Sequence, residues 1–205
     1  MSRRAPLTDA ARLAGWAVLM APLGLFLHEL GHFLAGRLLG FDDVRLGVAG
    51  VSGGARLGET ADRMVAIQAG AGPAVTLLLL ILAWAFVARS PRHLWAVALA
   101  ATAPLRFLVG AVFIGARLLT WLQGGVPGVP NFDEYNLAKA LGISPLPLAA
   151  VGAILLFGSW AWLWRRLPRG RRALTAAALA AGTAGGLFLW MGLVGPPLVA
   201  LINRA

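Results

Sequence analysis

The segment LFLHELGHFLAG, residues 25–36, places two histidines and a glutamate inside an otherwise apolar stretch. Residues four apart lie on one face of a helix, so His28 and His32 can offer two imidazole nitrogens to a single metal ion. Glu29 is rotated by about 100° from His28, so it lies beside such an ion rather than aimed at it. In HExxH helices the two histidines bind zinc and the glutamate is a general base for water. The segment therefore predicts a metal site within an apolar helix.

Chance, a polar surface patch and a structural network each account for these polar residues less well than a metal site does. With three histidines and three glutamates in the chain, a shuffled sequence would show HExxH in on the order of one case in a thousand. A polar surface patch disagrees with the apolar flanks GLFL and FLAG. A purely structural His/Glu network within a membrane span would cost free energy that a leucine would not. Metal binding is the interpretation that accounts for all three residues.

The composition is that of an integral membrane protein. The 205 residues are 59% hydrophobic and 13% charged, with a mean hydropathy of +0.77, whereas soluble domains carry about 25% charged residues. We therefore expect an all-α polytopic membrane protein that forms a single domain over residues 1–205. Apolar runs long enough to cross a bilayer, roughly 20 residues, fall at 13–39, 64–88, 94–122, 146–164 and 173–202.

The net charge of +10 does not indicate nucleic-acid binding. The arginines cluster in short loops between apolar runs, as topology determinants and lipid-headgroup contacts do, and no phosphate loop or zinc-finger spacing is present. With five spans, most arginines fall on the side of the N-terminus, so the positive-inside rule places that end in the cytoplasm. These arginines are Arg3, Arg4, Arg12, Arg89, Arg92, Arg165, Arg166, Arg169, Arg171 and Arg172.

Two features depart from a simple series of spans. The segment VRLGVAGVSGGARLG, residues 44–58, alternates apolar with polar or small residues around Gly53 and Gly54, which predicts a small β-hairpin between the first and second helices. Arg106 lies near the middle of the third apolar run. It either pairs with a carboxylate or an oxyanion at a functional site or marks a span broken at Pro104, and the sequence leaves both possibilities open.

A third metal ligand is expected outside HELGH. Catalytic zinc usually has three protein ligands and a water, and the chain has no cysteine, so the ligand is a nitrogen or an oxygen. NFDEYNLAKALG, residues 131–142, predicts a short amphipathic helix with Asn131 as N-cap and Gly142 as terminator. Asp133 and Glu134 follow a Gly/Pro-rich stretch that can re-enter the protein. One of these two carboxylates is therefore the best candidate on geometry.

HELGH in a first transmembrane helix resembles the site-2 protease family of intramembrane zinc metalloproteases. Members have a Gly-Pro motif in the next core helix, and AGAGPAVT, residues 69–76, is similar to it. Gly72 and Pro73 match the motif, and Thr76 stands where Asn is often found. The resemblance implies that this second helix supports the site or the substrate.

The third family element carries an aspartate ligand downstream of HExxH. By position it corresponds to VPNFDEYN, residues 129–136, and the resemblance then implies Asp133 as the third ligand. Glu134 replaces the family's usual glycine and is kept as a substrate-binding or supporting residue. The resemblance covers a metalloprotease-like core at 13–142, and residues 143–205 would add further transmembrane helices to a compact member.

The resemblance implies a Zn²⁺-dependent metalloendopeptidase in a bacterial cell membrane that cleaves membrane-protein substrates in or near the bilayer. Glu29 would take a proton from the attacking water, and Arg106 would support the site. In well-known bacterial members the catalytic end of the first helix faces the cytoplasm, opposite to the arginine count here. The alternative is an inactive pseudoprotease that binds a transmembrane partner. A zinc transporter or sensor is disfavoured because the last two spans contain few polar residues.

Overall fold

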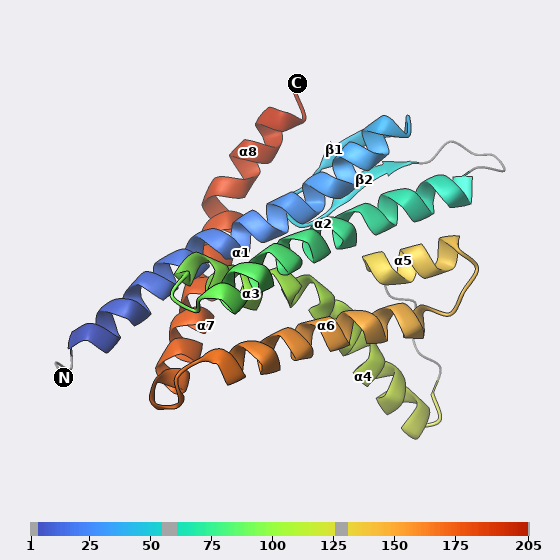
Figure 1. Ribbon diagram of the computed structural model, residues 1–205. Helices are drawn as coiled ribbons and strands as arrows, with labels where there is room; N and C mark the ends of the chain where they lie inside the picture. The colour runs from blue at the N-terminus through green and yellow to red at the C-terminus, as the bar shows by residue number, and fades with distance from the viewer. Residues whose placement is uncertain (1–3, 55–60, 126–130, 205) are drawn as a thin grey trace.

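The computed structural model describes residues 4–54, 61–125 and 131–204, and it confirms a helical membrane protein with one small antiparallel sheet (Figure 1). Large apolar side chains such as Leu78, Ile154 and Phe188 are exposed on the outside of the helices, as expected where helices contact lipid. The five segments long and apolar enough to cross a membrane are those expected: Leu7–Leu38, Asp62–Arg89, Leu94–Leu122, Pro145–Arg166 and Arg169–Ile202.

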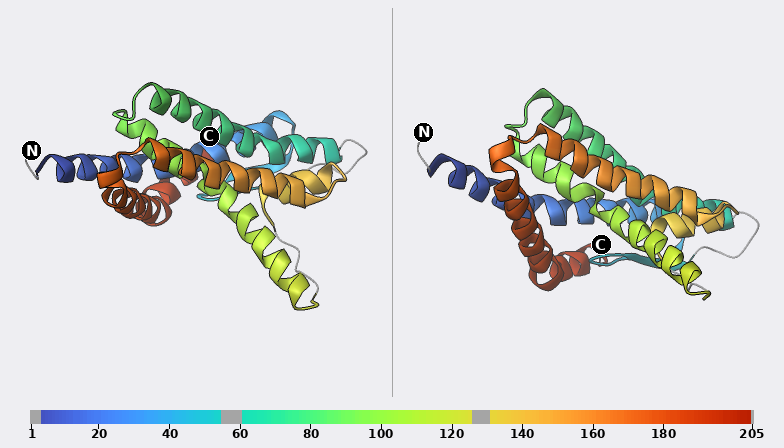
Figure 2. Two further views of the ribbon diagram at one scale, coloured as in Figure 1. Left: turned by 60° about the horizontal axis from the view of Figure 1, so that its bottom comes forward. Right: turned by 90° about the horizontal axis from the view of Figure 1, so that it is seen from below.

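The first, second and fourth spans are continuous α-helices, while the third and fifth are interrupted. The α4 helix (Leu108–Leu122) leans away from the other helices (Figure 2). The described elements are, in chain order, α1 (Arg4–Leu38), β1 (Asp42–Leu46), β2 (Val51–Gly54), α2 (Ala61–Arg89), α3 (Leu94–Thr102), the 3-10 segment η1 (Ala103–Phe107), α4 (Leu108–Leu122), α5 (Asp133–Ala140), α6 (Pro145–Arg166), the 3-10 turn η2 (Arg169–Arg171), α7 (Arg172–Leu189), the π-helical turn η3 (Trp190–Val194) and α8 (Gly195–Ile202).

The third span is broken at Pro104, which lies in η1. Proline has no N–H, so it cannot donate to the carbonyl of Ala100 four residues earlier. The side chains of α6 supply donors at this point: the Ser159 hydroxyl donates to the Ala100 carbonyl at 2.9 Å, and the Trp160 indole donates to the Ala101 carbonyl at 2.9 Å. Hydrogen bonds from α6 therefore stabilise the break in the third span.

The predicted hairpin is present between α1 and α2. Its reversal falls at residues 47–50, where the Gly47 N–H donates to the Gly50 carbonyl at 2.7 Å. Gly53 and Gly54 lie within β2 rather than at the turn, and residues 55–58 of the predicted segment lie outside the described residues. Gly53 has a φ of +148°, and a Cβ there would lie 3.0 Å from the Val44 Cα of β1. The absence of a side chain at Gly53 therefore allows the two strands to approach closely.

The short helix predicted after the second loop is α5, which packs against α2 and α6. Gly142 ends it in a left-handed conformation with a φ of +67°, as predicted. The N-cap was predicted wrongly, because the extended residue before the helix is Phe132. The Asn131 side chain instead accepts a hydrogen bond from the Asn136 amide at 2.9 Å. The cap one residue later makes Asp133 the first residue of α5.

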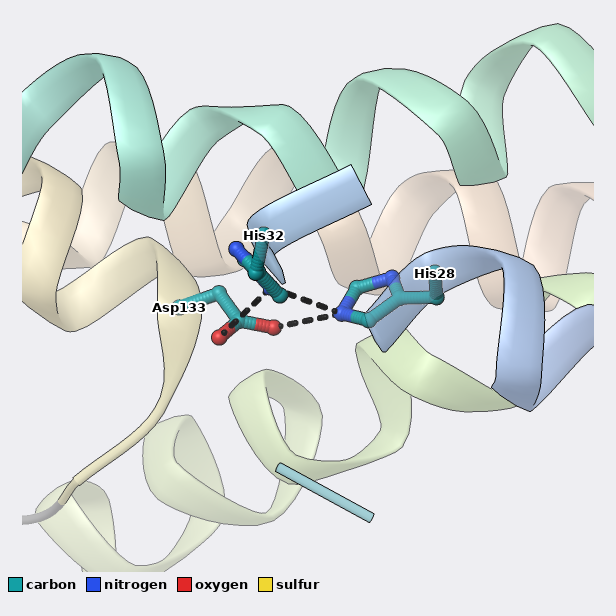
Figure 3. Close-up of side chains that lie close together, drawn as sticks. All are labelled: His28, His32 and Asp133. Atoms are coloured by element: carbon teal, nitrogen blue, oxygen red, sulfur yellow. Dashed lines mark hydrogen bonds and ion pairs between the residues drawn. The ribbon is translucent and has the colours of Figure 1, made fainter. Parts of the chain in front are cut away.

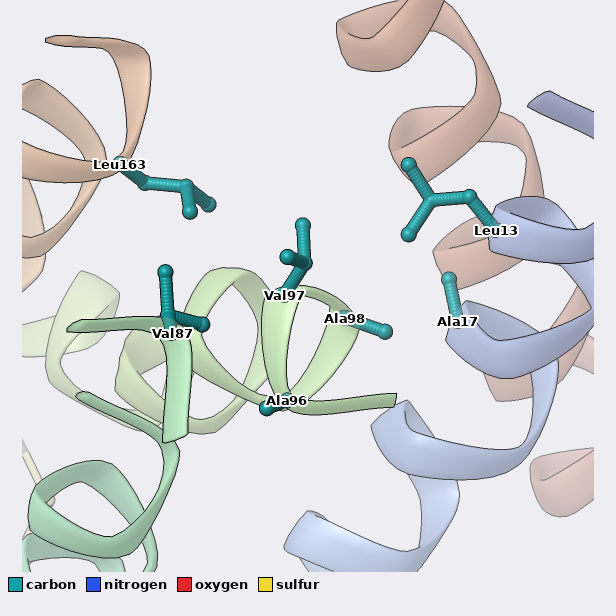
Figure 4. Close-up of a cluster of buried hydrophobic side chains, with 7 residues drawn as sticks. All are labelled: Leu13, Ala17, Val87, Ala96, Val97, Ala98 and Leu163. Carbon is teal, nitrogen blue, oxygen red and sulfur yellow. The ribbon is translucent and has the colours of Figure 1, made fainter. Parts of the chain in front are cut away.

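The N-terminal half of α1 packs against α7 through small residues. A Cβ on Gly182 would overlap the Ala14 carbonyl oxygen, and one on Gly186 would lie 2.8 Å from the Val18 Cα. Two glycines four residues apart let the two backbones touch, as in other membrane helix pairs. Beside this contact lies an apolar cluster of α1, α2, α3 and α6 (Figure 4), which contains Leu13, Ala17, Val87, Ala96, Val97, Ala98 and Leu163.

We expect Gly186→Ala to destabilise the protein and Gly185→Ala to be tolerated. The added methyl group at residue 186 meets the α1 backbone, whereas at residue 185 the nearest atom is the Val18 Cγ2 at 3.9 Å. Overpacking costs about 1–3 kcal/mol, so Gly186→Ala should lower the Tm by about 2–4 °C for each kcal/mol lost. Tryptophan fluorescence during thermal unfolding in detergent measures both variants, and equal Tm values would contradict the predicted backbone contact.

Candidate metal centre

Two histidines of α1 and the first residue of α5 point toward one another (Figure 3). His28 lies ten residues before the end of α1, about 15 Å along the helix axis. The Nε2 atoms of His28 and His32 are 3.2 Å apart, and Asp133 places Oδ2 2.8 Å from His28 Nε2 and Oδ1 3.2 Å from His32 Nε2. Among the described residues this is the group of His, Asp and Glu side chains that can hold a metal ion.

Three residues of α2, spaced four apart on one helix face, orient the two imidazoles. His32 Nδ1 donates to the Gln68 carbonyl at 2.7 Å, and His28 Nδ1 is hydrogen-bonded to the Thr76 hydroxyl at 2.8 Å. Between them, Gly72 lies against the His32 ring, where a Cβ would be 2.6 Å from Cδ2. The α2 helix therefore fixes both rings through the nitrogen that faces away from Asp133.

The hydrogen-bond pattern suits a bound cation. A carbonyl oxygen only accepts, so the proton of a neutral His32 ring is on Nδ1 and its Nε2 presents a lone pair to the centre. The Asp133 carboxylate adds further lone pairs, and such convergence is favourable around a metal. Tetrahedral zinc with ligands at about 2.0–2.1 Å separates two nitrogens by about 3.3 Å, close to the 3.2 Å between the Nε2 atoms. The residues thus fit a His₂-carboxylate metal site.

Pro73 follows the glycine and interrupts the hydrogen-bond ladder of α2. Because proline has no N–H, the Ala69 carbonyl lacks its usual helical donor four residues on. Ala69 lines the cleft beside the centre, as does Gln68. The Gly-Pro pair thus combines space for the His32 ring with a locally weakened helix next to the site.

Glu29 is 1% exposed and is paired with Arg106 from η1. The Arg106 Nη2 lies 2.8 Å from Glu29 Oε1 and 3.6 Å from Asp133 Oδ2. The guanidinium N–H is not aligned with Oε1, so the contact is an ion pair and Oε1 has no hydrogen bond among the described residues. The span is therefore broken at Pro104 and Arg106 also pairs with a carboxylate, while its role at a functional site stays a prediction.

The two acidic residues at the start of α5 have different surroundings. Burial would raise the pKa of Asp133, but hydrogen bonds to His28 and His32 hold that pKa below its usual range. Glu134 is turned toward α6, where a Cβ on Gly152 would lie 3.1 Å from its Oε1. Burial raises the pKa of Glu134 to about 7. Asp133 is thus the carboxylate that faces the histidines, and Glu134 is not part of the converging group.

A cleft of about 810 Å³ opens beside the centre. Glu29, His32, Arg106 and Asp133 lie on its wall, with the hairpin residues 49–51 among the other lining residues. Residues of α2, Val109 of α4 and part of the segment 131–140 complete the lining. The cleft is therefore large enough for a segment of peptide chain and gives it access to the centre.

Comparison with protein-family models, with curated proteins and with solved structures found no match to this chain. The assignment of the centre therefore depends on its own geometry. Sequence reasoning missed two contacts, the Gln68 backbone carbonyl on His32 and the Thr76 hydroxyl on His28. For Thr76 the available signal was its spacing from Gly72, since residues four apart lie on one face of a helix; the Gln68 carbonyl is a backbone atom and has no such signal.

Zinc affinity should depend on the absence of a side chain at residue 72. We expect the wild type to bind about one zinc per chain, and Gly72→Ala to lower the affinity by about 10–100-fold, as when the orientation of a ligand is lost. Gly70→Ala is the matched control, because its Cβ would lie 3.8 Å from the nearest atoms. Elemental mass spectrometry after equilibration in zinc buffers measures both, and equal zinc retention in the two variants would contradict the assignment.

A double-mutant cycle tests the ion pair. Arg106→Met leaves Glu29 buried without its cation. We expect the free energy of unfolding to fall by about 2 kcal/mol. This is less than for a fully buried ion pair, because the Arg106 side chain is 26% exposed. Adding Glu29→Gln should recover most of the lost Tm, since both charges are then gone. Arg117→Met is the control, because Arg117 belongs to the same span as Arg106 but lies over the Phe113 ring, 5.5 Å from its centroid. A purely additive cycle would argue against the Glu29–Arg106 ion pair.

Proposed function

We propose that this protein is an intramembrane zinc metalloprotease that hydrolyses peptide bonds of membrane-protein substrates in or near the bilayer. The observation that supports it most is the convergence of His28, His32 and Asp133 next to the buried carboxylate of Glu29. The resemblance of HELGH and AGAGPAVT to site-2 proteases points the same way. Two imidazoles and a carboxylate favour zinc among the common hydrolytic metals.

The chain supplies the acid–base chemistry of the reaction. Zinc held by the three ligands would act as a Lewis acid toward the scissile carbonyl and the attacking water. Glu29 accepts a proton as the water oxygen attacks the carbonyl carbon. It then delivers the proton to the amine nitrogen as the C–N bond breaks. Arg106 keeps the carboxylate in place while it is removed from bulk water.

The hairpin offers a place for an extended substrate. Gly47 and Gly50 exchange a hydrogen bond at the turn, so the next pair, Leu46 and Val51, is a non-hydrogen-bonded pair whose N–H and C=O groups point to the outer edges. Val51 lines the cleft of the metal centre. Peptide bonds in a helix are shielded, so an unwound segment could add to the outer edge of β2 beside the centre.

The Glu29–Arg106 ion pair also favours one alternative. A carboxylate already engaged by a guanidinium at 2.8 Å is less free to act as a base. The second candidate is therefore a pseudoprotease that binds a transmembrane partner without cleaving it. The two functions share the centre and the cleft, and they differ only in turnover.

Glu29→Gln separates these functions. In the zinc-loaded protein in detergent, we expect the wild type to hydrolyse labelled casein, an unfolded protein rich in extended segments. Glu29→Gln should keep its zinc and lose about 10²–10⁴-fold in rate, the range for loss of a general base. His28→Ala should lose both zinc and hydrolysis. A wild type that binds zinc without cleaving casein, and without differing from Glu29→Gln, would favour the pseudoprotease.

A further inference from the structure

The fifth span bends toward the hairpin. The α7 helix passes into the π-helical turn η3 and then into α8, which begins at Gly195. Pro196 and Pro197 follow at the start of α8 and cannot donate to the preceding turn. The break redirects the chain, so that α8 reaches β1 (Figures 1 and 2).

Asn203, at the end of α8, pairs with β1 as a neighbouring strand would. The Leu46 N–H donates to Asn203 Oδ1 at 2.9 Å, and the Asn203 Nδ2 donates to the Leu46 carbonyl at 2.8 Å. Leu46 is the last residue of β1, and its backbone groups point to the outer edge. One carboxamide therefore satisfies both outward-pointing backbone groups of Leu46 at the strand edge.

Trp190 makes a second attachment to the hairpin. Its indole N–H donates to the Val48 carbonyl in the turn at 2.7 Å, and the side chain is 5% exposed. The same ring packs edge-to-face on Phe26 of α1 with centroids 5.6 Å apart. Phe26 lies two residues before His28, so Trp190 links the hairpin turn to the helix that carries the metal ligands.

We propose that Asn203 is a positioning residue that closes the outer edge of β1 and, with Trp190, holds the outer edge of β2 as the docking edge for an extended peptide segment. This inference rests on the proposed function for the identity of the segment. With β1 closed, strand addition is directed to Val51 and the metal cleft. The attachment also fixes the register, because a slip of one residue moves a strand by about 3.3 Å, enough to place a different peptide bond at the centre.

The test uses Asn203→Leu, which removes both hydrogen bonds, and Asn203→Asp, which keeps the acceptor and loses the donor. Arg204→Ala is the neighbouring control. Amide hydrogen exchange of residues 41–54 reports the attachment, and we expect about tenfold faster exchange at Leu46 in Asn203→Leu, with Asn203→Asp in between. Zinc content should equal that of the wild type.

Binding of labelled casein is measured in the Glu29→Gln background, so that it does not depend on catalysis. We expect the Kd for Asn203→Leu to rise by about tenfold, and in the active protein KM should rise with kcat nearly unchanged while the cleavage positions spread. Unchanged exchange at Leu46, or faster exchange without a change in Kd or cleavage position, would overturn the inference. Binding without any hydrolysis would refute the protease while leaving the docking edge supported.

Discussion

The contact between two imidazoles of α1 and the Asp133 carboxylate of α5 imposes the main constraint on this molecule. Polar groups placed deep in an apolar helix bundle are stable only when each has a partner. His28 and His32 meet this condition in two directions, toward Asp133 on one side and toward α2 on the other. The close α1–α2 packing, the glycine at residue 72 and the entry of α5 between α2 and α6 all follow from satisfying these two rings.

The same constraint explains why the third span is broken. Glu29 is buried one residue after His28, and an ionised carboxylate there requires a cation that no continuous apolar helix would supply. Pro104 interrupts the span, η1 turns Arg106 toward Glu29, and the carbonyls at the break receive hydrogen bonds from α6. Polar groups of the first, third and fourth spans are thereby linked. The carbonyls of Ala100 and Ala101 at the break both have hydrogen-bond donors.

Features that depend on the length of apolar runs or on alternation of residue type were predicted well from the sequence. The apolar runs predicted all five spans, and the alternation of apolar with polar or small residues after the first helix predicted the hairpin. The N-cap of α5 was missed because the preference for Asn at a cap is weak beside the tertiary contact that places Asp133 at the first turn. The Gln68 carbonyl is a backbone atom that no residue type announces. Asn203 lies 157 residues from its partner Leu46, a pairing that only the three-dimensional path of the last span reveals.

The last span also explains how a small hairpin can persist at the edge of a membrane bundle. Two strands alone are marginal in water, and near lipid an open strand edge leaves backbone groups without partners. Asn203 and Trp190 satisfy backbone groups of Leu46 on one edge and of Val48 in the turn, while Val51 of the other strand lines the cleft. Under the proposed function, this closure of one edge would direct an extended substrate to the strand that lines the cleft, and the placement of the substrate would depend on the last span.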